Sequence, residues 1–481
     1  MTDPIYDEEK LRAEQVDVDS YEDASSAEAI LQKEIAEEAG NDIKYRSCSW
    51  QRTAMLLFSE YICLAIMSFP WSYSVLGLVP GLIITVFVAL TTLYTGKIIG
   101  DYCARYPTMM NICDIGQHLF WGAKWAWYAT AACFLLNNTM IQALHVLVGA
   151  KYLNTVSNHG ACTIAFSVVT AVLCFLVSLP RTFSEMSIVG LFSAATMFIA
   201  VLLAMIFAGV QSHPFGFEEG TPVVWHLWPQ EGTTYVQGMS AMLNIVYTFV
   251  GQICYPSFIA EMKNPKEFKK ALYLVTICEI TVFALAGSIV YVYVGNDYIT
   301  APAFGSLERK FKLASFSFAI PTLIFLGSLY SNVTCQFLFS IIFDQKSKHR
   351  TSHTIAGWAS WTGLNILTWV LAFIIAQVIP FFSDLLSLMS SLFDCWFGFV
   401  FWGVAYFRLK QAKYRGQFNS HGEFYKKLTG SEKLEYWICW VLILIGVYIL
   451  GPGTYASVDS IVINYRDSAY GNVFTCASNG L

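Results

Sequence analysis

The most regular feature of the chain is a series of apolar blocks separated by short polar segments. A helix needs roughly 20 apolar residues to cross the roughly 30 Å of bilayer hydrocarbon, and these blocks have that length. The pattern predicts an all-α polytopic membrane protein with about eleven transmembrane helices. Their expected limits are residues 51–78, 79–103, 125–149, 161–180, 187–210, 235–260, 271–294, 314–342, 356–379, 381–406 and 435–452.

Two of the predicted spans are interrupted at their centres. The first reads "SEYICLAIMSFPWSYSVLG" with Pro70, and the sixth reads "NIVYTFVGQICYPSF" with Gly251 and Pro256. Proline removes a helix hydrogen bond, and bare backbone at membrane depth is tolerated where it lines a cavity. One break alone indicates a kink. Two breaks five spans apart predict inverted five-span repeats, with helices broken near residues 66–71 and 251–256 and a binding site between them.

The ends of half-helices indicate the class of ligand. Helix N-termini offer free N–H groups and suit a carboxylate, whereas helix C-termini offer carbonyls and suit an ammonium group or a cation. No charged side chain stands at either break. A site of this kind suits a zwitterion, and we expect an α-amino acid.

Composition supports a membrane protein and argues against an enzyme. Of the 481 residues, 56% are hydrophobic and only 13% are charged, about half the charged share of a soluble domain. The sequence contains no GxSxG, HExxH or phosphate-loop motif, so we expect no catalytic residues. It carries no signal for a metal, an organic cofactor or a nucleic acid.

The charges are distributed unevenly. Residues 1–42 hold fourteen acidic and three basic side chains, which predicts that residues 1–46 are an acidic, mostly disordered tail. That tail is either a plain solvated segment or a docking site for regulatory partners. Counting Lys and Arg in the loops places 21 on one side of the membrane and 5 on the other. The positive-inside rule then puts the N-terminus in the cytoplasm and the C-terminus outside.

This topology divides the chain into a tail (1–46), a transmembrane domain (47–455) and an extracellular C-terminal tail (456–481). Cys162 and Cys476 both fall on the outside, where a disulfide persists, and we expect them to be bridged. Most of the other cysteines lie within spans and act as small apolar residues.

Several segments resemble the amino acid/auxin permease family. They include "GQICYPSFIAEMKNPKEF" in the sixth span, "FPWSYSVLGLVPG" in the first, and "LTTLYTGKIIGDY", "RYP" and "DIGQHLFWG" after it. The resemblance runs from Trp50 to Phe474, is specific to the family, and is greatest to fungal neutral amino acid permeases. It implies a LeuT-type fold of 5+5 inverted repeats plus one extra helix. It also implies secondary amino acid transport, driven by protons in fungal members.

The positions of the two breaks suggest the substrate contacts. We expect backbone around Ile66, Met67, Ser68 and Phe69 to hold the carboxylate, and carbonyls near Ser68 and at Thr248–Gly251 to hold the amino group. The residues Phe69, Cys254 and Tyr255 are candidates for the side-chain pocket, and plain packing is the alternative for each. Polar side chains at depth in the third span (Asn137, Asn138 and Gln142) are expected to face the interior, as hydrogen-bonding groups or as substrate contacts.

The sequence is compatible with two coupling ions, a proton or a sodium ion. Carboxyl groups within spans are functional candidates, and for a proton these are Glu60, Glu279 and Asp394, with Asp384 nearer a span end and His145 as a further exchanger. A sodium ion would instead be held between the first and eighth spans by carbonyls of Ala65 or Ile66 and by Ser328, Ser331 and Asn332. The resemblance favours protons.

At the inner end of the sixth span, Glu261 is expected to pair with Arg181 or another base on the inside and to latch an inner gate, with an ordinary helix-end ion pair as the alternative. The leading interpretation is a proton-coupled symporter that carries neutral L-amino acids, aliphatic or aromatic, across the plasma membrane into the cell. A vacuolar transporter and a non-transporting amino acid sensor with the same fold are the alternatives.

Overall fold

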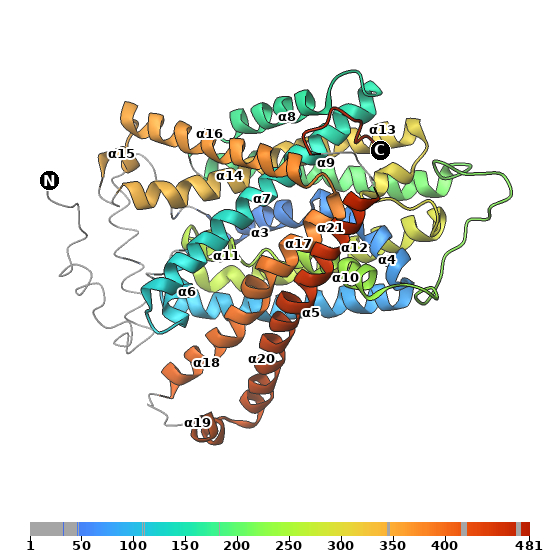
Figure 1. The fold of residues 1–481 in the computed structure, drawn as a ribbon. Coiled ribbons are helices and arrows are strands. Elements are labelled where there is room, and N and C mark those ends of the chain that lie inside the picture. The colour runs from blue at the N-terminus through green and yellow to red at the C-terminus, as the bar shows by residue number, and fades with distance from the viewer. Residues whose placement is uncertain are drawn as a thin grey trace.

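The long helices of the protein form one elongated bundle, seen in the computed structural model of Figure 1. The structure describes residues 32, 46, 48–107, 109, 111–181, 183–343, 347–414, 421–467 and 473–481. The expected acidic tail therefore lies outside the described residues, except at Gln32 and Arg46. Within the described ranges the chain is helical, with one isolated β-bridge between Cys48 and Met262. The expected all-α fold class is confirmed.

The first five-span unit opens with a broken helix. Its elements are α3 (Trp50–Tyr61), η2 (Leu64–Ser68), α4 (Phe69–Leu76), α5 (Leu78–Arg105), α7 (Lys124–Ser157), α8 (Thr163–Val177) and α9 (Phe183–Val210).

The second unit repeats this order and also opens with a broken helix. Its elements are α10 (Tyr235–Phe249), α11 (Tyr255–Ala260), α12 (Phe268–Val294), α14 (Ile320–Ile342), α16 (Ile355–Val378), and then α17 (Phe382–Met389), η5 (Ser390–Val400) and α18 (Phe401–Lys413) as one continuous span. Helix α10 starts at a capping box, in which Thr234 and Gln237 bond each other's backbone N–H groups.

One further long helix follows the two units. It comprises α20 (Gly430–Tyr448), η6 (Ile449–Gly453) and α21 (Thr454–Arg466). Shorter elements connect the spans: α6 (Ile112–Leu119), η3 (Pro265–Glu267), η4 (Ala303–Ser306), α13 (Arg309–Phe318), α15 (Lys348–Thr351) and α19 (His421–Lys427).

The two prolines at the breaks begin half-helices. Pro70 is the second residue of α4 and Pro256 is the second residue of α11. A proline in the first helical turn has no need of an N–H partner, so it starts a helix there without kinking it. Each break therefore lies on the N-terminal side of its proline.

This placement moves the first break from its expected position. Helix α3 ends at Tyr61, and the 3₁₀ turn η2 leads directly into α4. The interruption is thus at residues 62–63, before the expected 66–71, because residues 66–69 already have helical geometry. The second break covers residues 250–254 and agrees with the expected 251–256.

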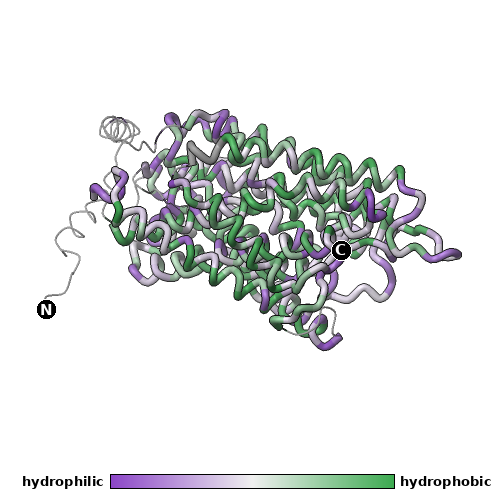
Figure 2. The backbone as a smooth tube through the Cα atoms, turned by 90° about the horizontal axis from the view of Figure 1, so that it is seen from above, coloured by the Kyte–Doolittle hydropathy of each residue, from purple (hydrophilic) through white to green (hydrophobic). Residues whose placement is uncertain are grey.

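Nine helices among the described residues are long and apolar enough to cross a membrane. They correspond to nine of the eleven expected spans. The other two expected spans are shorter in the structure: α8 has 15 residues, and the sixth span is divided into α10 with 15 residues and α11 with 6. Figure 2 shows the hydrophobic residues along the long helices and the hydrophilic residues gathered in loops at both ends of the bundle.

The last long helix extends further than the sequence suggested. The expected tail began at residue 456, but α21 continues helically to Arg466. The segment "GPG" at 451–453 has the appearance of a stop signal, yet it forms the π-helical turn η6 that joins α20 to α21. A single wide turn of this kind accommodates the missing N–H of Pro452 without ending the helix.

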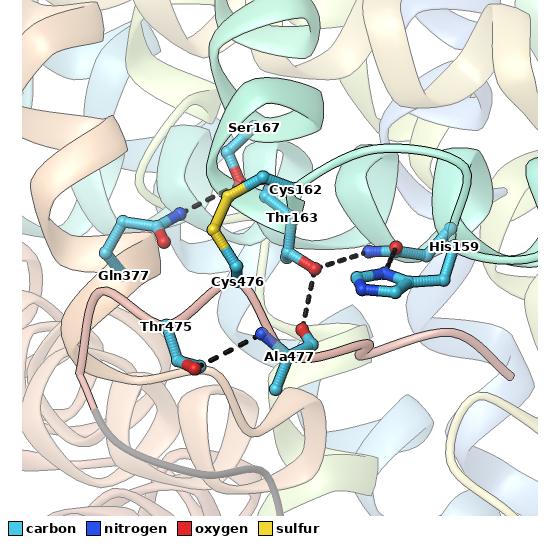
Figure 3. The surroundings of a disulfide bond; sticks show 9 residues. His159, Cys162, Thr163, Ser167, Gln377, Thr475, Cys476 and Ala477 are labelled. Carbon is cyan, nitrogen blue, oxygen red and sulfur yellow. Dashed lines mark hydrogen bonds between the residues drawn. A yellow bond between two sulfur atoms is a disulfide. The ribbon is translucent and has the colours of Figure 1, made fainter.

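A disulfide joins Cys162 to Cys476, as expected from the topology. It ties the start of α8 to residues 473–481, and Figure 3 shows the surrounding hydrogen bonds. The Thr163 hydroxyl donates to the Ala477 carbonyl at 2.7 Å, and the Asn154 amide donates to Asn479 Oδ1 at 2.7 Å. We call this end of the bundle, marked by Cys162 and Cys476, the disulfide end.

Alkylation of the unreduced, solubilised protein is expected to leave Cys162 and Cys476 unmodified, because both sulfur atoms are in the bridge. After proteolysis, mass spectrometry should find the two cysteine peptides as one linked species that dithiothreitol separates. A Cys162→Ser variant is the control, since it leaves Cys476 free to react. Alkylation of both thiols in the unreduced parent protein would show that the bridge does not form.

Candidate substrate site

A buried cavity lies where the two breaks meet. It has a volume of about 50 Å³ and is formed by both broken spans together with α7, α14 and η5. A water molecule needs about 10–15 Å³ by this measure, so the cavity holds a few waters. An amino acid needs the surrounding helices to move apart. The lining residues are Glu60, Tyr61, Cys63, Leu64, Ala65, Asn137, Ile141, Leu144, His145, Val148, Tyr247, Thr248, Val250, Gly251, Ile253, Leu323, Leu326, Tyr330 and Asp394.

The first break reaches the cavity through residues 63–65. Cys63, which precedes the 3₁₀ turn η2, and Leu64 and Ala65, its first two residues, line the cavity. The amides of Ala65 and Ile66 lie within hydrogen-bonding reach of the Cys63 sulfur. Amides that converge on one acceptor at a break suit the carboxylate of an amino acid.

The second break presents the C-terminal end of α10. Thr248, Val250 and Gly251 line the cavity there. The last carbonyls of a helix have no partners within that helix, so this end suits an ammonium group. The Gly251 N–H donates to the Tyr61 hydroxyl at 3.1 Å, which fastens the second break to the end of α3.

Carboxyl and tyrosine groups form a network beside the two breaks. The Tyr330 hydroxyl of α14 donates to Glu60 Oε1 at 2.6 Å, and the Cys254 thiol lies beside the same carboxyl group. The hydroxyls of Tyr61 and Tyr255 are hydrogen-bonded to each other. Glu60 is 6% exposed, so its carboxyl group is held at the cavity wall with little contact with bulk water.

Glu60 and Asp394 are the two acidic groups that line the cavity among the expected coupling residues. Glu279 is also buried and interacts with Tyr61 and Tyr255, but it does not line the cavity. Asp384 lies farther along α17, where it is bonded to α21. His145 lines the cavity, and its Nδ1 is 2.7 Å from the Ile141 carbonyl.

Of the eight expected substrate contacts, Thr248 and Gly251 line the cavity. The other six are buried next to it without lining it: Ile66, Met67, Ser68, Phe69, Cys254 and Tyr255. The difference follows from the earlier position of the first break, which exposes residues 63–65 in place of residues 66–69. Phe69 instead packs in an aromatic cluster with Phe249 and Phe283, at ring-centroid distances of 6.1 and 5.2 Å.

The groups proposed for a sodium ion are engaged elsewhere. The Ser328 hydroxyl donates to the Cys174 carbonyl of α8 at 2.8 Å, and the Ser331 hydroxyl donates to Asn365 of α16 at 2.9 Å. The Asn332 amide donates to the Pro180 carbonyl. These three side chains fasten α14 to its neighbours, and they do not line the cavity.

The expected gate residues lie at the end of the bundle away from the disulfide. Arg181 donates to the His349 carbonyl at 3.0 Å and stacks over Phe339, 4.7 Å from the ring centroid. Glu261 follows α11, and its backbone carbonyl accepts from the Cys48 N–H at 2.9 Å. Both charged side chains are buried.

Several residues of the site were not anticipated from the sequence, among them Tyr61, Cys63, Leu64, Tyr247 and Tyr330. The sequence could have indicated Tyr61 and Cys63, because polar groups next to Glu60 within an apolar block need buried partners. Tyr330 is 270 residues from Glu60, and no local pattern relates the two.

Comparison with known proteins identifies the family. Residues 46–428 match the family described as "Transmembrane amino acid transporter protein". A relative described as "N amino acid transport system protein" from Neurospora crassa is 31% identical over 452 residues, covering 93% of this chain and 92% of the relative. Auxin transporter-like protein 1 of Arabidopsis thaliana is 22% identical, covering 76% of this chain and 75% of the relative.

A solved structure shows the same fold. A mutant manganese transporter of Eremococcus coleocola matches with a TM-score of 0.52 at 12% identity, covering 89% of this chain and 92% of that chain. At this identity the likeness concerns the fold alone, which is of the LeuT type. The relatives are transporters and not enzymes. By sequence match and by fold, the chain belongs to the transmembrane amino acid transporter family.

Proposed function

We propose that this amino acid transporter is a proton-coupled symporter that brings neutral L-amino acids into the cell across the plasma membrane. The observation that carries the proposal is the single cavity at which both helix breaks and two acidic side chains meet. The breaks supply amides for a carboxylate and carbonyls for an ammonium group. Glu60 and Asp394 supply titratable groups in contact with the same space.

The lining favours a neutral substrate side chain. Among the described residues around the cavity there is no Lys or Arg to neutralise an acidic substrate. Much of the wall is aliphatic, including Leu64, Ile141, Leu144, Leu323 and Leu326. An apolar substrate side chain loses little solvation in such surroundings, whereas a charged one loses a great deal.

Proton coupling is favoured over sodium coupling by the hydrogen bonds of the site. A sodium ion needs several oxygens arranged around one point, and Ser328, Ser331 and Asn332 are bonded to α8, α16 and the Pro180 carbonyl. A proton needs only a titratable group that exchanges between the two sides, and Glu60 lines the cavity with its carboxyl group bonded to Tyr330.

The inner gate and the orientation are parts of the same proposal. The distribution of Lys and Arg supports a cytoplasmic N-terminus. We place the inner latch at Glu261 and Arg181, because buried charges at a loop end stabilise one arrangement of the helices over another.

Uptake of a labelled neutral amino acid, measured with a panel of twenty unlabelled competitors at two external pH values, tests the proposal. We expect the neutral amino acids to compete, acidic and basic ones not to compete, and uptake to be faster at the lower pH. Collapse of the proton gradient should stop accumulation, and replacement of external sodium should not. Uptake that survives an uncoupler but requires external sodium would overturn proton coupling.

A further inference from the structure

Three helices that are distant in sequence carry polar residues at helical spacing on faces that meet inside the bundle. Ser240 and Asn244 are one turn apart on α10, Ser390 and Asp394 are one turn apart in η5, and Asp384 lies in α17, six residues before Ser390. Thr454 begins α21. We call Ser240, Asn244, Asp384, Ser390, Asp394 and Thr454 the polar seam.

The three helices are packed against one another. Asp384 of α17 accepts hydrogen bonds from the Ser460 hydroxyl at 2.7 Å and from the Asn464 amide at 2.6 Å, both on α21. A Cβ atom added at Gly453 would lie 3.1 Å from Met239 of α10 and 3.5 Å from Ser391 of η5. Figure 1 shows α10, α17 and α21 crossing at the centre of the bundle.

Most of the polar seam lacks hydrogen-bond partners within the protein. Unpaired buried atoms are Ser240 Oγ, both amide atoms of Asn244, Asp394 Oδ2 and Thr454 Oγ1. Ser240, Asn244, Ser390 and Asp394 are each at least 95% buried. Buried polar groups in folded proteins are almost always bonded to protein or to ordered water. Unpaired buried groups on three helices that pack together indicate ordered water between these helices.

The polar seam connects the cavity with the disulfide end. Its inner end is Asp394, which lines the cavity, and the Ser390 hydroxyl lies next to that carboxyl group. Its other end is Asp384, whose partners Ser460 and Asn464 are half-buried and reach the surface. The titratable groups around Asp394 are Glu60, Tyr61, Cys63, His145, Tyr247, Tyr330 and Cys395.

We propose that the polar seam is a hydrated proton route to Asp394. The proposal rests on the proposed proton coupling. A proton from water at the disulfide end passes along hydroxyls and ordered water, each O–H bond that forms replacing one that breaks. It reaches the Asp394 carboxylate, which becomes a neutral acid until it passes the proton across the cavity to Glu60, and no electron is transferred.

The test uses the full chain reconstituted in lipid vesicles and two transport measurements. The first is accumulation of a labelled neutral amino acid driven by a proton gradient. The second is exchange of labelled for unlabelled amino acid at equal pH, which needs no net proton movement. Asn244→Leu replaces a hydrated amide by an alkyl group of similar size, so water cannot pass.

We expect Asn244→Leu to lower proton-driven accumulation by about tenfold or more, since each lost hydrogen bond in the route raises the barrier to transfer. Exchange should remain within about twofold of the parent, a difference too small to reflect a damaged substrate site. Asn244→Ser keeps a hydroxyl and room for water, so it should restore most of the proton drive. Thr454→Val should act in the same direction, and Thr281→Val, the same change on the exposed face of α12, should not.

Equal losses in both measurements would assign the polar seam a structural role and overturn the proposal. If the parent and the Asn244→Leu variant respond equally to the proton gradient, the proposed proton route is overturned and the proposed proton coupling stands. A parent that ignores the gradient would overturn the proposed coupling, and the proton route with it.

Discussion

A Gly251→Ala variant is expected to lose amino acid uptake, by more than about tenfold, while still reaching the membrane. A Cβ atom at this position would lie 2.6 Å from the Tyr61 hydroxyl and 3.1 Å from Glu60 Oε1. Both neighbours are buried and hydrogen-bonded, so they cannot swing away. Overpacking of this kind costs about 1–3 kcal/mol and here falls on the contact between the two breaks.

Gly238→Ala is the matched control for this prediction. Gly238 lies in the same span, and a Cβ added there meets nothing within 4 Å. Its uptake should equal that of the parent. Adding Tyr61→Phe to Gly251→Ala removes the nearest clashing atom and should restore part of the uptake. Normal uptake by Gly251→Ala, at equal surface expression, would show that the second break is not closely packed during transport.

A Glu60→Gln variant is expected to exchange amino acids but no longer to accumulate them against a gradient. Glutamine has the shape of glutamate and keeps an oxygen that accepts from Tyr330, so the site retains its geometry. It cannot take up or release a proton in the working range of pH. The pH dependence of uptake should therefore disappear, as measured by initial rates at several external pH values.

Glu267→Gln is the matched control, because that carboxyl group pairs with Lys270 at the surface and contributes little. It should keep the pH dependence of the parent. The opposite result would contradict the assignment of the coupling proton to Glu60. In that case uptake by the Glu60→Gln variant would still depend on the proton gradient, and uptake by the Glu279→Gln variant would not. That result would place the coupling proton at Glu279, away from the cavity wall.

The spans and their breaks could be predicted because the information is local. Apolar blocks indicate which segments cross the membrane, and Pro70 and Pro256 indicate where each half-helix begins. The expected first break lies a few residues too far along the chain, because Pro70 begins a half-helix and does not mark the interruption itself. Whether residues 64–68 continue a 3₁₀ turn depends on their packing against α10 and α12, which no local pattern contains.

The cavity could be predicted only in part, for the same reason. Thr248 and Gly251 belong to a break and were found from it. Tyr330, Leu323 and Leu144 reach the cavity from unbroken helices, and whether they line it depends on how α7 and α14 rotate against α3. The disulfide was predictable despite its sequence separation of 314 residues, since sidedness alone left two outside cysteines.

That disulfide also closes a covalent ring. The ring runs from Cys162 through α8 to α21 and back at Cys476, so it contains the whole second repeat and the last two spans of the first. Helices α3 to α7 lie outside the ring and are joined to it covalently only through the backbone that enters Cys162. A single backbone cut within the ring, for example in the 211–234 loop between α9 and α10, opens the ring without releasing a fragment. A cut between α5 and α7 instead divides the molecule in two, and only non-covalent packing then holds the first break against the second.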